Sequence, residues 1–389
     1  MKRVITTLAG AALVALSAGQ ALAQQQGVTK NEIVVGTIQD LSGPVAAFGK
    51  AVRQGMQLRV DEINEQGGIN GRKIKFIAED NGYDPKKAVL AAQKLVNQDK
   101  VFAILGHIGT AMNNAAMPIQ FEKNIVNFFP VTAAREMYEP VHKLKFAFAV
   151  SYYDQIRTFA PRLAKEKNVK KVCIIYQDDE FGLEVLRGAE AGLKTINMEL
   201  AEKTTYKRGA TDFSSQVAKL KSSGCEMVVL GTIIRETIGT IGESRKTGFN
   251  PVFLASTAGY TELIHKLGGP AMNGLYAAMA SQVPYLDDPS PPLRFWANKF
   301  KTKFNEDPTL FAAYGYIIMD AFGQAATKAG PNLTTDTFVR AMETLKLPPD
   351  IFGTPEATFS PTKRLGNNAS RLSQITDGKW KVISDYVQP

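Results

Sequence analysis

The stretch from Phe102 to Ala133, FAILGHIGTAMNNAAMPIQFEKNIVNFFPVTA, holds the strands and turns around which the chain is predicted to fold. Its first four residues are an apolar run, as expected of a short strand buried on both faces. Gly106 begins a turn that ends this strand, and Thr110 opens a helix-compatible segment that runs toward Phe121. The order strand, turn, helix is typical of a parallel α/β sheet.

A second strand is predicted at Ile125–Phe129, where another apolar run stops before a proline. Thr132 and Ala133 are predicted to begin the next helix. In an open α/β sheet, two such turns lie together at the carboxyl edge of the strands, where ligands bind. Free N–H groups and the positive ends of helix dipoles meet there, and the hydroxyls of Thr110 and Thr132 add directed donors. The pattern suits a small anion or a carbonyl oxygen, although helix N-caps explain the two threonines equally well.

The first 23 residues have the pattern of a secretory signal peptide. Lys2 and Arg3 make the start positive, Val4–Ala18 is apolar, and Ala21 and Ala23 form a small-residue cleavage site. The apolar run is short and rich in Ala and Gly, which argues against a membrane span. We therefore expect cleavage after Ala23 and an exported protein without a cysteine for a lipid anchor.

The remaining length suggests two domains rather than one. The formal net charge of the chain is +9, and its basic residues are scattered among acidic ones. Nucleic-acid binding requires a basic stripe with stacking aromatic residues, and the sequence contains neither, so nucleic acid is not an expected partner.

Two cysteines occur in the whole sequence. Cys173 lies inside a predicted strand, and Cys225 comes just before another. If the two strands are neighbours, a single disulfide is possible in an oxidising compartment. Two buried free thiols fit the sequence equally well, because cysteine packs as a small hydrophobic residue.

The alternation of strand and helix occurs twice along the chain, which predicts two doubly wound α/β lobes. The strands of the first run are predicted at Ile33–Ile38, Lys73–Ala78, the two runs described above and Phe146–Val150. Those of the second run are predicted at Val172–Tyr176, Glu199–Thr205, Met227–Gly231, Val252–Ala255 and Gly274–Ala280.

The last hundred residues contain too few strands for a third lobe. Helices are predicted at Leu293–Asn305, Phe311–Lys328 and Thr335–Leu345, followed by a hairpin of Leu372–Ile375 and Trp380–Ile383. We expect these elements to complete the first two lobes, so that the chain crosses between the lobes more than once. Such crossings form a hinge with a cleft that can close on a ligand.

Several short motifs are spread over the chain: Gly43-Pro44-Val45-Ala46-Ala47-Phe48-Gly49, Ile63-Asn64 with Gly67-Gly68-Ile69-Asn70-Gly71, Asp80-Asn81 with Asp84-Pro85, Gly106-His107 before Thr110, and Pro130 ahead of Thr132-Ala133. Together they resemble the periplasmic binding proteins for leucine, isoleucine and valine. The resemblance implies a type I periplasmic binding protein with two lobes and a three-segment hinge. Lobe 1 would comprise residues 28–150 and 283–356, and lobe 2 residues 151–282 and 357–389.

The resemblance also implies a function. Members of this family are receptors that deliver solutes to an ABC permease with its cytoplasmic ATPase, so we expect a monomeric periplasmic protein with no enzymatic activity, catalytic residue, cofactor or metal. The three histidines, His107, His142 and His265, lack metal-ligand spacing. The family's disulfide in the first lobe is missing, because the matching positions are Tyr83 and Gly109.

Ligand-binding positions follow from the same resemblance. In the first lobe, Thr110, the backbone around Val131 and the residue at Ala133 would hold the ligand carboxylate. Ala133 lacks the usual hydroxyl, which Thr132 or backbone N–H groups would replace. The remaining expected contacts are Phe48, Ile108 and Gly109 in the first lobe, and Tyr152, Phe181, Ile233 and Thr257 in the second.

The positions of Tyr152 and Thr257 carry acidic groups in the members that bind amino acids, where they pair with the α-ammonium. Neither position is acidic here, and burying an unpaired ammonium costs several kcal/mol. We therefore expect a small carboxylic acid without an amine, aromatic or branched aliphatic. An amide or urea ranks second, and an α-amino acid third, unless Asp154 or Glu262 supplies the missing charge.

The sequence also bears on two other classes of protein. Gly43–Lys50 has one residue too many for a phosphate-binding loop, and Ala51 stands where Ser or Thr should bind Mg²⁺, which argues against a nucleotide-dependent enzyme. The same fold also serves as the sensing module of membrane receptors, and a free sensory partner of such a receptor remains an alternative.

Overall fold

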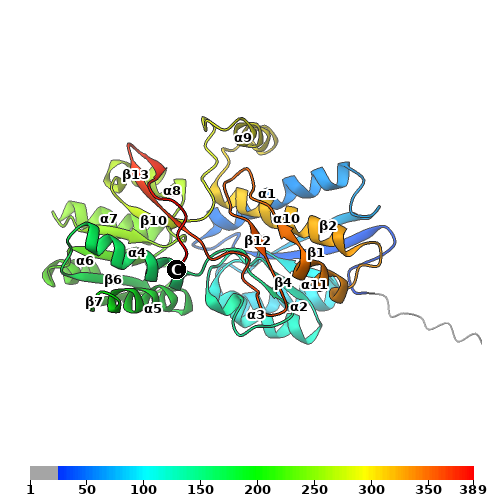
Figure 1. Cartoon of the computed structure of the whole chain (residues 1–389), viewed down its shortest axis with the longest axis horizontal. Helices are drawn as coiled ribbons and strands as arrows, with labels where there is room; N and C mark the ends of the chain where they lie inside the picture. The colour runs from blue at the N-terminus through cyan, green and yellow to red at the C-terminus, as the bar shows by residue number, and fades with distance from the viewer. Residues whose placement is uncertain (1–24) are drawn as a thin grey trace, which may run out of the picture.

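The computed structural model describes residues 25–389; the predicted signal peptide lies outside the described residues. Figure 1 shows two sheets side by side, each flanked by helices. The first sheet is parallel, with the strand order β2-β1-β3-β4-β5. Its strands are β1 (Glu32–Gln39), β2 (Lys73–Asp80), β3 (Ala103–Leu105), β4 (Val126–Phe128) and β5 (Lys145–Phe146).

The second sheet has the strand order β14-β13-β10-β9-β8-β6-β7, and it is parallel except for β13 and β14, which are antiparallel. Its strands are β6 (Val172–Gln177), β7 (Leu200–Tyr206), β8 (Met227–Gly231), β9 (Val252–Ala255), β10 (Tyr276–Met279), β13 (Arg371–Thr376) and β14 (Lys379–Val382). The two doubly wound lobes predicted from the sequence are therefore confirmed.

Helices connect the strands of both sheets. Those between strands of the first sheet are α1 (Ala46–Glu65), α2 (Pro85–Gln93) with the π-helical turn η1 (Lys94–Gln98), and α3 (Thr110–Glu122). Those of the second lobe are α4 (Tyr152–Glu166), α5 (Glu180–Lys194), α6 (Ser214–Ser222), α7 (Arg235–Lys246) and α8 (Glu262–Gly268) with η3 (Gly269–Met272). Within residues 25–389, no helix has the length and apolar composition needed to cross a membrane.

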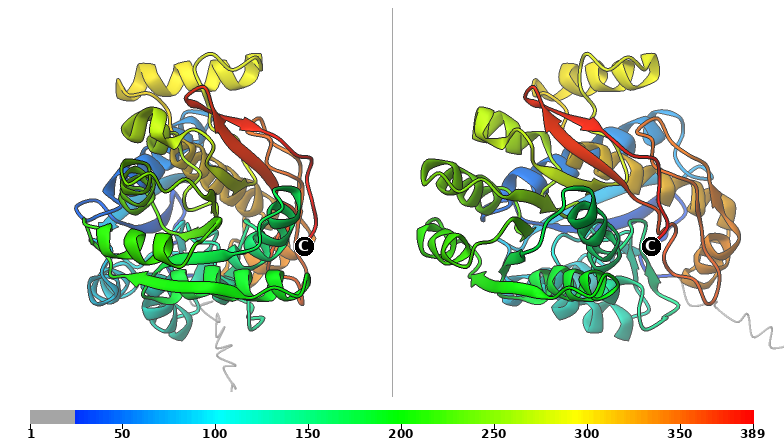
Figure 2. Two further views of the ribbon diagram at one scale, coloured as in Figure 1. Left: turned by 90° about the vertical axis from the view of Figure 1, so that its left-hand side faces the viewer. Right: turned by 60° about the vertical axis from the view of Figure 1, so that its left-hand side comes forward.

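The C-terminal elements contribute to both lobes. The helices are α9 (Pro291–Phe304), α10 (Leu310–Ala329) and α11 (Thr335–Thr344), and the short strands β11 (Lys346–Leu347) and β12 (Ala357–Thr358) pair with each other. Helix α10 packs along α1, whereas β13 and β14 extend the second sheet (Figure 2). The chain passes between the lobes after β5, after β10 and before β13. The residue boundaries of the lobes stay a prediction.

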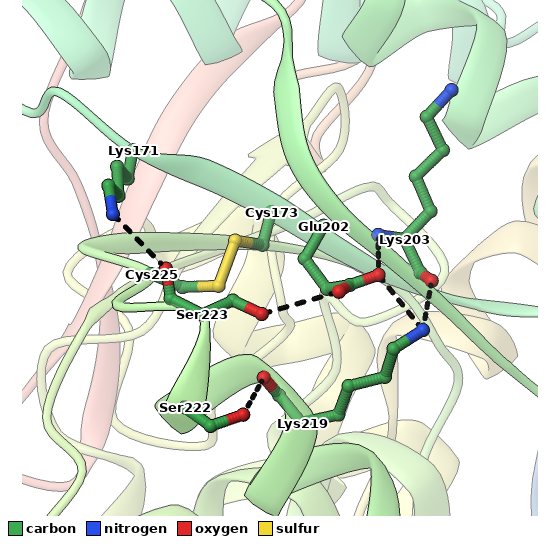
Figure 3. The surroundings of a disulfide bond; sticks show 8 residues. All are labelled: Lys171, Cys173, Glu202, Lys203, Lys219, Ser222, Ser223 and Cys225. Atoms are coloured by element: carbon green, nitrogen blue, oxygen red, sulfur yellow. Dashed lines mark hydrogen bonds and ion pairs between the residues drawn. A yellow bond between two sulfur atoms is a disulfide. The ribbon is translucent and has the colours of Figure 1, made fainter.

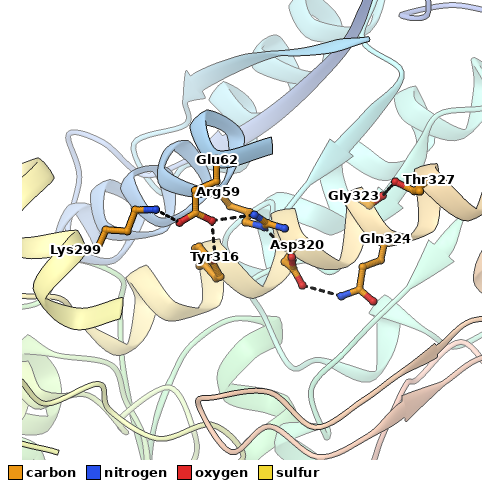
Figure 4. A network of polar contacts seen from close by, with 8 residues as sticks. All are labelled: Arg59, Glu62, Lys299, Tyr316, Asp320, Gly323, Gln324 and Thr327. Carbon is orange, nitrogen blue, oxygen red and sulfur yellow. Dashed lines mark hydrogen bonds and ion pairs between the residues drawn. The ribbon is translucent and has the colours of Figure 1, made fainter. Parts of the chain in front are cut away.

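A polar network joins α1 and α10 (Figure 4). Arg59 donates to Glu62 on its own helix, at 2.9 Å, and to Asp320 on α10, at 2.7 Å. Glu62 also accepts from the Tyr316 hydroxyl and from Lys299 on α9, both at 2.7 Å. Both charged partners of Glu62 help to hold its pKa below the ordinary value, although partial burial opposes them. The network therefore links α1 to α9 and α10, which are distant from it in the sequence.

The prediction that Thr132 and Ala133 begin a helix is wrong. Val131 continues in extended form beside the turn that follows β3, with both its N–H and its C=O hydrogen-bonded to that turn. The Ala133 carbonyl accepts from the Tyr152 N–H at 2.7 Å. Because these backbone groups bond to other segments, none is left to close a helical turn. A single 3₁₀ turn follows, η2 (Arg135–Met137).

The fifth strand is shorter than the predicted Phe146–Val150. After β5, the Ala147 N–H donates to the Arg364 carbonyl at 2.8 Å, and the Ala147 carbonyl accepts from Gly366 N–H at 2.9 Å. The chain thus leaves the sheet to pair with the C-terminal segment. Because the strand ends here, Phe148 and Ala149 line the cavity described below.

Cys173 and Cys225 form a disulfide, with their Cα atoms 5.8 Å apart (Figure 3). Cys173 lies on β6, and Cys225 comes just before β8, which pairs with β6. Both side chains are buried. Of the two alternatives that the sequence left open, the structure has the disulfide.

Candidate functional site

A cavity of about 70 Å³ lies where elements of the two lobes meet. Every residue selected from the sequence as a ligand contact lines it: Phe48, Ile108, Gly109, Thr110, Val131, Thr132, Ala133, Tyr152, Phe181, Ile233 and Thr257. The first seven belong to the first lobe and the other four to the second. The structure therefore brings the whole predicted set together, while its role in binding stays a prediction.

The polar wall of the cavity is built on the turn before α3. Gly109 precedes the helix with φ of 91°, a backbone conformation that favours glycine, and Thr110 is the first helical residue. The Thr110 and Thr132 hydroxyls lie 2.7 Å apart and are hydrogen-bonded to each other. The first N–H groups of a helix have no partner within it, so this end of α3 presents donors and a positive dipole. These groups suit an anion or a carbonyl oxygen.

Val131 contributes to the wall differently from the expectation. Its N–H already donates to the His107 carbonyl at 3.0 Å, and its carbonyl accepts from Gly109 N–H at 3.2 Å. In this structure neither backbone group is free for a ligand. Val131 therefore supplies an apolar surface, and the hydrogen-bonding groups come from the threonines and the helix terminus.

Tyr152 brings the second lobe against this wall. It is the first residue of α4, whose N-cap Ser151 accepts from the Asp154 N–H. Burial raises the pKa of the Tyr152 phenol, although the neighbouring Ala133 backbone and Thr132 side chain oppose this shift. Tyr152 and Phe181 meet edge to face, with ring centroids 5.0 Å apart. The two side chains together close one side of the cavity.

Several lining residues were missed by the sequence analysis: Val45, Tyr83, Pro130, Phe148, Ala149, Ala258, Phe311 and Tyr314. Phe311 stacks on Phe48 with centroids 3.5 Å apart and an interplanar angle of 9°. Tyr314 packs edge to face against Phe311 and Phe148, at 5.4 and 5.7 Å. Phe311 and Tyr314 lie in an apolar helix, where aromatic residues three apart give no signal that distinguishes a cavity wall from core.

Among the residues that the structure describes, no charged side chain lines this cavity. Asp154 instead accepts from Arg157 at 3.0 Å, and Glu262 accepts from the Leu310 N–H at 3.2 Å. Neither acid suggested as a substitute counter-charge therefore reaches the site. Asp179 lies behind Phe181, whose N–H donates to it at 3.1 Å, and burial raises the pKa of this carboxyl.

His107 lies in the turn before α3 but does not line the cavity. The side chain is fully buried, and within residues 25–389 neither ring nitrogen has a hydrogen-bond partner. Burial lowers its pKa to about 3. The imidazole is therefore neutral and part of the core.

Two doubly wound lobes that meet around a small, mostly apolar cavity define the class of type I periplasmic binding proteins. A family model described as "Periplasmic binding protein" matches residues 32–379. The chain belongs to this family and to its branched-chain amino acid type, the ABC solute-binding proteins related to the Leu/Ile/Val-binding proteins. The family consists of substrate-binding proteins rather than enzymes.

The leucine-specific-binding protein of Salmonella typhimurium is 25% identical over 327 residues, which cover 84% of this chain and 88% of that protein. A fatty acid ABC transporter substrate-binding protein from Thermomonospora curvata has a TM-score of 0.84 at 22% identity, covering 94% of this chain and 95% of the other. A solute-binding protein from R. palustris in complex with benzoate has a TM-score of 0.80 at 18% identity, covering 92% and 98%. The protein is therefore a periplasmic solute-binding protein of an ABC-type transporter.

Proposed function

We propose that this protein captures a small carboxylate that carries an aromatic ring or a branched aliphatic chain and no α-amine. One observation carries the proposal: the cavity combines a hydroxyl pair at a helix N-terminus with aromatic walls and lacks a lining carboxylate. The carboxylate of the solute would accept from Thr110 and Thr132 and face the positive end of α3. Its apolar part would lie among the rings of Phe48, Phe311 and Tyr314.

Because no acidic side chain of residues 25–389 lines the cavity, binding of an α-amino acid is disfavoured. Its ammonium would lose its hydration without gaining a counter-charge. A neutral amide or urea would use the same hydroxyls but would leave the dipole of α3 without a negative partner. The carboxylate therefore ranks first. The benzoate complex of the R. palustris relative is compatible with this order, and the leucine-specific relative supports the alternative.

In this proposal the solute first binds the turns of the first lobe, and Tyr152, Phe181 and Thr257 then close over it. The closed form is the one that the ABC permease would recognise. We also propose that residues 1–23 direct export to the periplasm and are removed, and that the mature protein acts as a monomer.

A thermal-shift screen of the mature protein, refolded to remove bound solute, tests the proposal. The panel is built from matched pairs: 4-methylpentanoate and leucine differ by the α-amine, and benzoate and benzamide differ by the charge. Binding to the folded state adds about 2.7 kcal/mol to the unfolding free energy when free ligand is in hundredfold excess over Kd, and this gain raises the melting temperature. We expect shifts with the two acids and none with leucine or benzamide. A larger shift with leucine than with 4-methylpentanoate would overturn the argument from the missing counter-charge.

A further inference from the structure

Arg135 of the first lobe is inserted into the second lobe. It lies in η2, two residues after Ala133 of the cavity wall. Its Nε and Nη2 donate to the two carboxylate oxygens of Glu184 on α5, at 2.9 and 2.7 Å, and its backbone N–H donates to the same carboxylate at 3.2 Å. Such a bidentate contact is the strongest form of ion pair in geometry and energy.

The surroundings of this pair exclude water on the side of the second lobe. The Glu184 side chain is only 1% exposed. The guanidinium of Arg135 also lies over the ring of Tyr153 on α4, 3.9 Å from its centroid. Arg135 is therefore held by two helices of the second lobe, although it belongs to the chain segment that follows β4 of the first.

Both partners are close to cavity residues in sequence. Arg135 follows Ala133, and Glu184 comes three residues after Phe181, one turn further along α5. Moving Arg135 away from Glu184 would therefore also separate the Ala133 wall from the Phe181 wall. The ion pair therefore joins a first-lobe part of the cavity wall to a second-lobe part.

We propose that Arg135 and Glu184 are positioning residues that hold the two walls of the cavity together and bias the protein toward its closed form before any solute binds. The pair exists only when the lobes meet, so its interaction energy is added to the closed form alone. In an open form, Glu184 would keep its contact with Arg187 of its own helix, and water would replace the contact with Arg135. The inference does not depend on which solute the protein captures.

Small-angle X-ray scattering of the refolded, solute-free mature protein tests this inference. Glu184→Gln and Arg135→Gln remove the pair from either side, and Arg187→Gln is the matched control. Arg187 donates to the same Glu184 carboxylate at 3.4 Å, but from the same helix, so its loss leaves the contact between the lobes intact. We expect a larger radius of gyration for both pair variants and an unchanged value for the control.

Three further readouts separate positioning from a general structural role. Circular dichroism verifies that each variant folds. If Glu184→Gln does not fold, the test uses Arg135→Gln, whose substituted side chain is partly exposed. The double variant should have the radius of gyration of either single variant, because one interaction is lost in all three. Adding 1 M NaCl should increase the radius of gyration of the wild type less than either substitution does. Salt screens a buried ion pair only weakly. Equal radii for wild type and pair variants, or equal expansion of the Arg187→Gln control, would overturn the inference.

Discussion

Removal of the Cys173–Cys225 disulfide should destabilise this protein substantially. The bond closes a loop with a sequence separation of 52 residues, and a cross-link of that length removes about 14 cal/mol/K of entropy from the unfolded chain. At 25 °C this corresponds to about 4 kcal/mol of unfolding free energy. The bond lies between neighbouring strands of the second sheet, so we expect the loss to appear in the unfolding of that lobe.

Urea unfolding, monitored by circular dichroism, measures this loss in three samples: the oxidised protein, the same protein reduced with dithiothreitol, and Cys173→Ala/Cys225→Ala. The first should unfold at a higher urea concentration than the other two, since the midpoint falls with the unfolding free energy. Dithiothreitol should not change the double variant, which controls for effects of the reductant. Equal midpoints for oxidised protein and protein shown by mass spectrometry to carry two free thiols would refute the reasoning.

Three further predictions concern single residues. Thr110→Val should weaken benzoate binding in calorimetric titration by about 1–2 kcal/mol, because a buried hydroxyl donor to the carboxylate is lost; unchanged affinity would remove Thr110 from the site. Gly55→Ala should lower the unfolding free energy in urea by about 1–3 kcal/mol, because the new Cβ would lie 1.9 Å from the Ala312 carbonyl oxygen. Gly242→Ala on α7 meets no atom within 4 Å and serves as the control, so equal losses in both variants would contradict this account. His107 has a folded pKa of about 3, so the unfolded state binds a proton that the folded state excludes, and stability should fall by about 4–5 kcal/mol as the pH drops from 6.5 toward 3. His107→Leu should lose this part of the pH dependence in unfolding measurements between pH 7 and 4, and an unchanged slope would show that other groups cause it.

The local pattern of residues was sufficient to predict most of the fold. Val52, Met56, Val60 and Ile63 recur at the spacing of an amphipathic helix, and all four side chains are buried in α1. The strand at Met227–Gly231 is found at its predicted bounds, and the C-terminal hairpin is present as β13 and β14. Such patterns are legible in sequence because helix and strand periodicity depends on residues only a few positions apart.

The predictions from sequence were wrong where the backbone bonds to segments that are distant along the chain. A helix was predicted to begin at Thr132 and Ala133, yet the adjoining Val131 pairs with the turn after β3, and the Ala133 carbonyl accepts from Tyr152. The short β5 has the same cause, since Ala147 pairs with a segment more than two hundred residues later. Local propensity cannot include partners that only the folded chain brings near.

The sequence by itself determined two α/β lobes, the family resemblance and the set of motif residues that the structure gathers around one cavity. Only the tertiary structure decided which residues complete that cavity, because Phe311 stacks on Phe48 across more than 260 positions of sequence. It also decided that the cysteines pair and that Arg135 crosses to Glu184. These contacts depend on how the lobes and their helices pack, and packing is a property of the whole chain rather than of any local stretch.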